Sequence, residues 1–247
     1  MYLIGDIGNT EIKICLFNKN LNLIRKIRIK TNLLNKNYLS KNLKFINNYS
    51  LEIQKVLICS VVPLAYKKIK KFIEQSIKIK CIELKQLKLN NLLKIKVNKK
   101  QIGSDRIANA IGAYCKYKTN CIVLDFGTAT TFDVIKNGVY LGGVIAPGIR
   151  LSLNTLISNA EQIPPFNLKK INKVIGNNTV NALRSGFYWG YAGLIENLLL
   201  LIKKHTKTKY KVILTGGFSL LFKNSIKSKV IVDRDITMKG LIQLLKL

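Results

Sequence analysis

The sequence predicts an α/β protein made of two similar halves that face each other across a cleft. The stretches "DIGNTEIKICLF" (6–17) and "DFGTATTFDVI" (125–135) both place an acid, a glycine and a threonine at a strand end, before another strand. They stand about 120 residues apart, which is the size of a small domain. Strand-like and helix-like stretches alternate after each of them. We therefore expect an N-terminal domain over residues 1–115 and a C-terminal domain over residues 116–247.

In the first half, alternation predicts strands and helical spacing predicts helices. Residues 1–30 read as hairpin strands with a turn at "NKN", and the continuous apolar run 55–62 reads as a buried strand. Apolar positions at helical spacing predict a helix over 101–118, which Ser104 or Asp105 could cap. The other elements expected here are a helix over 37–50, a helix that starts at Pro63 and a strand at 80–84.

The second half repeats this order. A strand that ends at Asp125 is followed by a second strand, and Asn137-Gly138 is typical of the hairpin turn after it. "VYLGGVIAPG" (139–148) continues the sheet. The remaining elements expected are helices over 149–160 and 178–204, a strand at 211–217 and a closing helix.

Composition indicates a cytosolic protein without redox or metal chemistry at cysteine. No apolar run reaches the roughly 18 residues that a membrane span needs, and the N-terminus lacks the basic start of a signal peptide. The five cysteines form no CxxC pair, so we expect buried, apolar thiols. We therefore expect no membrane partner.

The net charge of +30 raises the alternative of nucleic-acid binding. The lysines are spread along the whole chain and interleaved with isoleucine and asparagine, residues that A/T-rich codons specify. They form no local patch with interleaved aromatic residues, the arrangement that single-strand binders use. We therefore attribute the charge to drift in composition and expect no specific nucleic-acid partner.

The repeated turn is suited to binding a polyphosphate. Glycine lets the backbone turn tightly and approach a ligand, and the amides around it can donate to an anion. The threonine adds a hydroxyl donor, and the aspartate can hold a cation, or a water on Mg²⁺, that bridges to phosphate. A late "TGG" (215–217) after a strand could let a nucleotide approach the backbone. Two such hairpins predict a nucleotide phosphotransferase.

This arrangement resembles the actin-like ATPase superfamily, in which two duplicated, ribonuclease H-like α/β domains surround a nucleotide cleft. Five motifs in register resemble the type III pantothenate kinases within it. They extend over nearly the whole chain. They are "DIGNT" (6–10), "GSDR" (103–106), "DFGTATT" (125–131), "GGVIAPG" (142–148) and "IGNNTVNALRSG" (175–186).

The resemblance implies that ATP phosphorylates the primary hydroxyl of pantothenate, the first step of coenzyme A biosynthesis. It also implies a cytoplasmic homodimer that needs Mg²⁺ and a monovalent cation, K⁺ or NH₄⁺. Asp105 would be the base, Thr128 would contact ATP and Asp125 would hold the monovalent cation. Thr179 would reach pantothenate from the second domain or from the partner subunit. The first phosphate loop would comprise Asp6, Ile7, Gly8, Asn9, Thr10, Glu11, Ile12 and Lys13, and the pantothenate segment would comprise Gly103, Ser104, Asp105 and Arg106.

The residues themselves agree in part. A carboxylate near the alcohol is the natural acceptor for its proton, and Arg106 could pair with the carboxylate of the substrate. In isolation, the same two residues would fit a plain helix cap beside an exposed cation. Asp133 could be a surface acid, and the sole histidine, His205, sits at a helix end among lysines, which excludes His-based triads.

The chain departs from the family pattern at one place. The family usually has Tyr-x-Asn-Pro before "GSDR", and this chain has Lys96-Val97-Asn98-Lys99 there. Two other functions remain open. One is a sugar kinase of the same superfamily, which the absence of large insertions disfavours. The other is a non-catalytic transcriptional accessory factor, which the presence of Asp6, Asp105, Asp125 and Thr128 disfavours.

Overall fold

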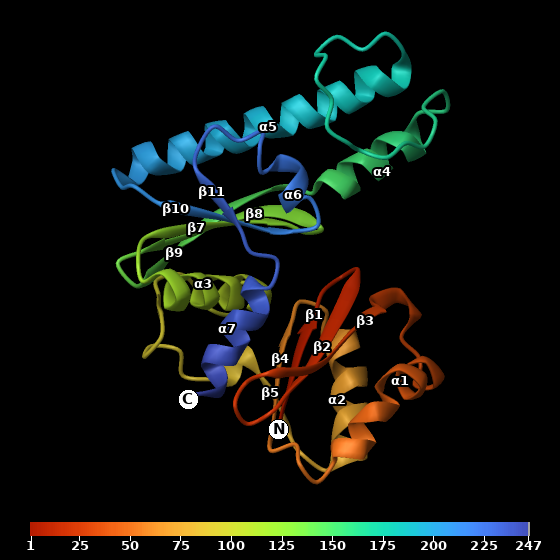
Figure 1. Cartoon of the computed structure of the whole chain (residues 1–247), viewed down its shortest axis with the longest axis vertical. Helices are drawn as coiled ribbons and strands as arrows, with labels where there is room; N and C mark the ends of the chain where they lie inside the picture. The colour runs from red at the N-terminus through yellow and green to blue at the C-terminus, as the bar shows by residue number, and fades with distance from the viewer. Residues whose placement is uncertain (247) are drawn as a thin grey trace. The chain divides into compact units, whose positions relative to one another are not determined.

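The computed structural model describes residues 1–246 and divides into two compact units. The first unit consists of Met1–Lys118, Gly138–Tyr140 and the chain from Asp235 onward. The second unit consists of Thr119–Asn137 and Leu141–Arg234. The last helix, blue in Figure 1, therefore belongs with the red and yellow N-terminal part of the chain.

A five-stranded sheet forms the centre of the first unit. Its strand order is β3-β2-β1-β4-β5. The first three strands pair antiparallel, as the hairpin pattern predicted, and β4 and β5 add to the sheet in parallel. The strands are β1 (Tyr2–Ile7), β2 (Glu11–Phe17), β3 (Leu23–Lys30), β4 (Lys55–Ser60) and β5 (Cys81–Glu83).

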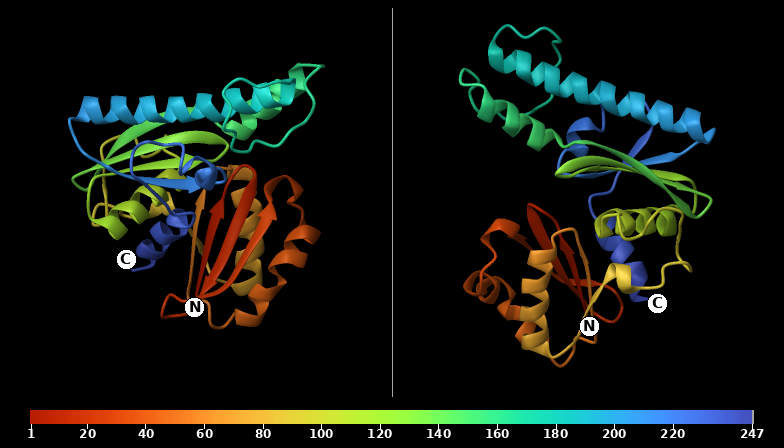
Figure 2. Two further views of the ribbon diagram at one scale, coloured as in Figure 1. Left: turned by 45° about the horizontal axis from the view of Figure 1, so that its top comes forward. Right: turned by 180° about the vertical axis from the view of Figure 1, so that it is seen from behind.

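Helices cover both faces of this sheet. On one face, α1 (Lys36–Leu43) and α2 (Pro63–Ile77) bury their apolar sides against the strands. On the other face, α3 (Ser104–Tyr117) and α7 (Ile236–Leu245) pack against each other and against β1 and β4 (Figure 2). Short 3₁₀ helices follow β3, α1 and β5 at η1 (Thr31–Leu33), η2 (Lys44–Tyr49) and η3 (Leu84–Gln86).

A long helix covers one face of the second sheet. That sheet has the order β11-β10-β7-β8-β9-β6, with β7 and β8 antiparallel and β10 parallel to β7. The cyan helix α5 (Thr179–Thr206) packs Tyr188, Ile195 and Leu199 against this sheet (Figure 1). The elements are β6 (Lys94–Ile95), β7 (Cys121–Phe126), β8 (Ala129–Lys136), β9 (Val139–Pro147), β10 (Lys211–Gly216), β11 (Val230–Val232), α4 (Ile149–Asn159) and α6 (Ser219–Phe222).

Several expectations are met and three details differ. Asn137 and Gly138 both have positive φ, as the hairpin turn between β8 and β9 requires. The helix expected over 37–50 is α1 followed by the 3₁₀ helix η2. The helix expected over 101–118 begins only at Ser104, because Gly103 is its N-cap. The cysteines Cys15, Cys59, Cys81 and Cys121 are buried and free, whereas Cys115 is free but only partly buried, unlike the expectation.

No helix among residues 1–246 is both long enough and apolar enough to cross a membrane.

Candidate active site

The segment predicted as the first phosphate loop contains the tight turn between β1 and β2. The Gly8 N–H donates to the Glu11 carbonyl at 3.0 Å, and Asp6 and Lys13 stand opposite each other in the antiparallel register. The Lys13 ammonium lies 3.5 Å from the Asp6 carboxylate. Thr31 buttresses the turn, since its hydroxyl donates to the Gly8 carbonyl at 2.7 Å.

The eight residues of this loop differ in exposure. Asn9 and Thr10 are exposed at the tip, whereas Ile7 and Ile12 are fully buried in the core. The isoleucine side chains therefore hold the loop on the sheet, and the backbone and polar side chains are the groups that can meet a ligand.

Asp6 lies among groups that the sequence analysis did not single out. The Cys59 thiol on β4 donates to Asp6 Oδ1 at 3.5 Å, because the two residues are partners in the parallel β1–β4 register. Burial raises the pKa of Cys59 well above its usual value, so the thiol stays protonated and can donate. Only the pairing of β1 with β4 reveals this contact, and a motif search cannot find it.

Asp105 is the second residue of α3. Its Oδ1 accepts the backbone N–H of Arg106 at 2.7 Å. Burial raises the pKa of Asp105 above its ordinary value, and the nearby Asp6 charge raises it further, while the Arg106 backbone and guanidinium lower it. The predicted cap by Ser104 or Asp105 is wrong: the N-cap is Gly103, which has no side chain to cap with. Within the first unit, Asp6 and Asp105 therefore lie close enough for the charge of one to affect the pKa of the other.

Ser104 is fully buried and does not present its hydroxyl to solvent. The hydroxyl lies 2.8 Å from the Ser60 carbonyl and 2.7 Å from the Glu83 carboxylate. Neither partner could be predicted from the sequence, because the ends of β4 and β5 are distant from Ser104 along the chain.

The second phosphate loop joins β7 to β8 in the second unit. The Gly127 N–H donates to the Ala129 carbonyl at 3.1 Å, which closes the turn, and Thr128 is exposed at its tip. Gly148, before α4, packs its Cα against the Thr128 carbonyl, so that a Cβ there would collide with it. This contact explains why the last residue of the motif "GGVIAPG" is glycine.

Asp125 is the penultimate residue of β7, which ends at the same edge of the sheet as β10. Gly216 on β10 has a φ of 81°, which favours glycine. A Cβ at Gly216 would lie 2.5 Å from Asp125 Oδ1 and 2.6 Å from the Phe126 carbonyl oxygen. These two oxygens therefore crowd the Gly216 Cα, so that only glycine fits at this position.

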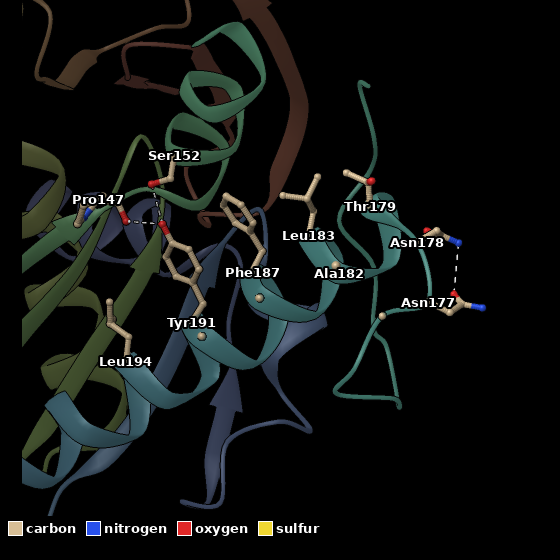
Figure 3. A pocket seen from close by; sticks show the side chains of 13 residues that line it. Pro147, Ser152, Asn177, Asn178, Thr179, Ala182, Leu183, Phe187, Tyr191 and Leu194 are labelled. Atoms are coloured by element: carbon tan, nitrogen blue, oxygen red, sulfur yellow. Dashed lines mark hydrogen bonds between the residues drawn. The ribbon is translucent and has the colours of Figure 1, made fainter. Parts of the chain in front are cut away.

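Thr179 lies away from the phosphate loop of its unit, at the first turn of α5. Asn178 caps this helix by accepting the N–H of Asn181 at 2.9 Å. Thr179 lines a pocket of about 900 Å³ between α4 and α5 (Figure 3). Phe187, Leu183 and Leu194 line its apolar side, and the Ser152 and Tyr191 hydroxyls meet there at 2.8 Å.

Asp133 and His205 differ in their exposure to solvent. Asp133 is fully buried on β8, so its interpretation as a surface acid is wrong. His205 is exposed at the end of α5, as expected.

At the position of departure, Lys96 is exposed and its N–H donates to the Tyr140 carbonyl at 3.1 Å. Lys99 stands where the family has proline, and its ammonium donates to the Leu87 carbonyl at 2.8 Å. Desolvation lowers the pKa of Lys99. The nearby Glu83 charge raises this pKa, but the net shift is downward. A side-chain contact therefore restrains this segment.

Comparison with solved structures identifies the fold. A Campylobacter jejuni chain described as a Baf family transcriptional activator superposes with a TM-score of 0.62 at 23% identity, over 99% of this chain and 97% of that chain. A Sinorhizobium meliloti chain described as a 2-dehydro-3-deoxygalactonokinase superposes with a TM-score of 0.61 at 10% identity, over 100% and 96%. The fold is the two-domain α/β fold of actin-like kinases.

Comparison with sequences identifies the family. The model of the type III pantothenate kinases matches residues 2–200. The type III pantothenate kinase of Pelagibacter ubique (strain HTCC1062) is 57% identical over 243 residues, which cover 98% of this chain and 98% of that chain. This chain belongs to the type III pantothenate kinase family.

Proposed function

We propose that this chain uses ATP to phosphorylate the primary hydroxyl of pantothenate to 4'-phosphopantothenate, with Asp105 as the base. The observation that supports this most is the placement of Asp105, half-buried at the start of α3 and electrostatically coupled to Asp6 of the first phosphate loop. A carboxylate of raised pKa accepts a proton from an alcohol more readily than an ordinary aspartate does. Phosphoryl transfer otherwise depends on positioning and on charge neutralisation.

The two loops bind ATP in this proposal. The first loop lies in the domain of residues 1–115 and comprises Asp6, Ile7, Gly8, Asn9, Thr10, Glu11, Ile12 and Lys13. Thr128 contacts ATP from the second, in the domain of residues 116–247. Gly103, Ser104, Asp105 and Arg106 form the pantothenate segment, in which Arg106 pairs with the substrate carboxylate. Buried Ser104 contributes to this segment by fixing its position.

Mg²⁺ fits the first loop. The Asp6 side chain has an exposed fraction of 13%, and Asp6 is the penultimate residue of β1, next to the loop. In residues 1–246 no three histidine, cysteine or acidic side chains gather as a metal cage. Mg²⁺ commonly uses one or two carboxylates together with substrate phosphates and water, so one aspartate is enough. When bound, the ion would neutralise phosphate charge.

The monovalent cation is assigned to Asp125 in this proposal. Its carboxylate lies beside the second loop, and a hard cation prefers oxygen donors. We expect pantothenate-dependent ADP release to require K⁺ or NH₄⁺, and Asp125→Asn to weaken the activation by K⁺. A coupled ADP-release assay across the chloride salts of Na⁺, K⁺ and NH₄⁺ measures this. Equal rates in Na⁺ alone would contradict the assignment.

The same assay tests the reaction itself. ADP release with ATP, Mg²⁺ and K⁺ is measured on pantothenate and on a panel of sugars. We expect turnover of pantothenate only. Turnover of a sugar without turnover of pantothenate would favour the sugar-kinase alternative.

A homodimer would cover the pocket on α5. Its floor contains the exposed glycines Gly186 and Gly190, which leave open space along the helix. Thr179 then reaches pantothenate from the partner subunit or from its own second domain. We expect a dimer in sedimentation, and a monomer for Gly190→Glu, because the new charge would be buried in the interface. Leu51→Glu, at a fully exposed position of the first unit outside this pocket, is the control and should stay dimeric. A Gly190→Glu variant that sediments as a dimer would move the interface elsewhere.

The charge of +30 is the feature that favours the alternative of a transcriptional accessory factor. For a cytoplasmic enzyme without a specific nucleic-acid or membrane partner, we expect only weak, sequence-independent binding to duplex DNA. Such binding falls steeply with salt because phosphate neutralisation alone drives it. Fluorescence anisotropy measures the affinity between 50 and 200 mM salt. Over this range a protein with many phosphate contacts loses ~10³-fold or more in affinity. Tight binding to one sequence at physiological salt would support the accessory-factor function.

A further inference from the structure

The Glu83 carboxylate joins the end of β5 to the start of α3. Its Oε1 lies 2.7 Å from the buried Ser104 hydroxyl, the first side chain of the helix. Its Oε2 accepts the Lys85 N–H at 2.6 Å, and its own N–H donates to Gln86 Oε1 at 3.1 Å. Both carboxylate oxygens are therefore used, one for the turn after β5 and one for α3.

Ser104 connects this carboxylate to a third segment. Its hydroxyl also lies 2.8 Å from the Ser60 carbonyl, at the end of β4. One hydroxyl has one proton, and a carboxylate is a stronger acceptor than a neutral carbonyl. The Ser60 N–H also donates to Ser104 Oγ at 3.4 Å. Glu83 therefore supplies the strongest of the contacts that hold the first residue of α3 against the strand ends.

The cap of α3 adds no side-chain anchorage to these contacts. Its N-cap is a glycine, so the cap contributes no side-chain hydrogen bond. The next residue after Ser104 is Asp105, and burial is the main cause that raises the pKa of its carboxyl. A shift of Ser104 would move Asp105 with it and admit water around the carboxylate.

We propose that Glu83 is a positioning residue, which acts through Ser104 to hold Asp105 where it can accept the proton of the substrate hydroxyl. This inference rests on the proposed function, in which Asp105 is the base. It assigns to Glu83 a geometric role and no contact with the substrate. Position, and not negative charge, is what Glu83 supplies.

Two substitutions separate position from charge. Glu83→Leu removes both acceptors. Glu83→Gln can keep the whole network: its amide oxygen accepts the Lys85 N–H, its amide N–H donates to Ser104 Oγ, and the Ser104 proton turns to the Ser60 carbonyl. We expect kcat to fall between about 10-fold and 10²-fold in Glu83→Leu, the scale of a small misplacement. We expect Glu83→Gln to stay within roughly threefold of the wild type, since one net hydrogen bond is the most it would lose.

The pH profile gives a readout that a loss of stability alone would not move. Burial raises the pKa of Asp105, so exposure to water lowers it toward the ordinary value. The acid limb of kcat should therefore shift to lower pH in Glu83→Leu and stay unchanged in Glu83→Gln. KM for ATP should stay near the wild-type value in both, because Glu83 touches neither phosphate loop.

Glu74→Leu is the matched control. Glu74 is a carboxylate on α2 that accepts the Cys81 N–H at 2.9 Å at the other end of β5, without contact to α3. Per folded protein, measured by circular dichroism, it should keep the wild-type kcat and acid limb. If Glu83→Leu does not fold, Ser104→Ala, which keeps the Glu83 bond to Lys85, should show the same two changes.

The outcomes divide cleanly. An active wild type with unchanged kcat and acid limb in Glu83→Leu, or in Ser104→Ala where the former does not fold, overturns the inference alone. A Glu83→Gln variant as impaired as Glu83→Leu overturns the positional role in favour of charge. A wild type that does not turn over pantothenate overturns the proposed function instead.

Discussion

In the Asp105→Asn variant we expect kcat for pantothenate phosphorylation to fall roughly 10²-fold or more, the scale of losing a general base. Asparagine keeps the shape and can still accept the Arg106 N–H, so α3 should start as before. KM for ATP should be nearly unchanged, because Asp105 belongs to the pantothenate segment. Steady-state kinetics with ATP and pantothenate varied in turn measures both constants.

The pH dependence sharpens this result. The base must be ionised, and burial raises the pKa of Asp105, so wild-type kcat should be lost as pH falls through a value above that of an ordinary aspartate. The variant should lack this acid limb. Asp235→Asn is a suitable control, because Asp235 is exposed and pairs with Lys26 on the protein surface. An Asp105→Asn enzyme with most of its activity would leave Asp105 as a structural residue only.

The second large effect concerns stability. In Gly240→Ala we expect the free energy of unfolding of the first unit to fall by about 3 kcal/mol, the upper range for overpacking. The new Cβ would collide with the Ala108 carbonyl and lie 3.0 Å from the Gly112 nitrogen. These are backbone atoms of α3 that no rotamer change can move, so the helices must separate. Thermal unfolding followed by circular dichroism should show a midpoint lower by roughly 6 to 12 °C.

A glycine in open space is the control for this substitution. Gly193, in the middle of α5, has nothing within 4 Å of its built Cβ. Gly193→Ala should therefore gain up to about 1 kcal/mol from helix propensity. A Gly240→Ala protein as stable as the wild type would mean that α3 and α7 do not pack backbone to backbone.

The hairpins were predictable from sequence because period-two patterns and special turn residues act locally. The strands at 2–7 and 121–126, and the turn at Asn137-Gly138, all follow from neighbouring residues. The motifs for the family are likewise short and local. The short strands β6 and β11 were not predicted, because two or three residues show no periodicity.

Contacts across the sheet were not predictable. Cys59 meets Asp6 only through the β1–β4 register, and Glu83 meets Ser104 only because β5 ends beside α3. Asp133 was misread because an acid within an apolar strand gives no sign of burial on both faces. The roles of the site residues and the domain division at 115 and 116 stay predictions.

The return of the chain to its first unit has a consequence for biosynthesis. α7 packs directly on α3, the helix that begins with Ser104 and Asp105, yet it is made only after the second unit. As the ribosome extends the chain, the N-terminal sheet can form early, but α3 lacks its packing partner until the whole second unit has emerged. Domains that are continuous in sequence fold as they leave the ribosome, whereas this one must wait. A chain cut short before Ile236 would therefore carry both predicted phosphate loops but leave α3 without its packing partner.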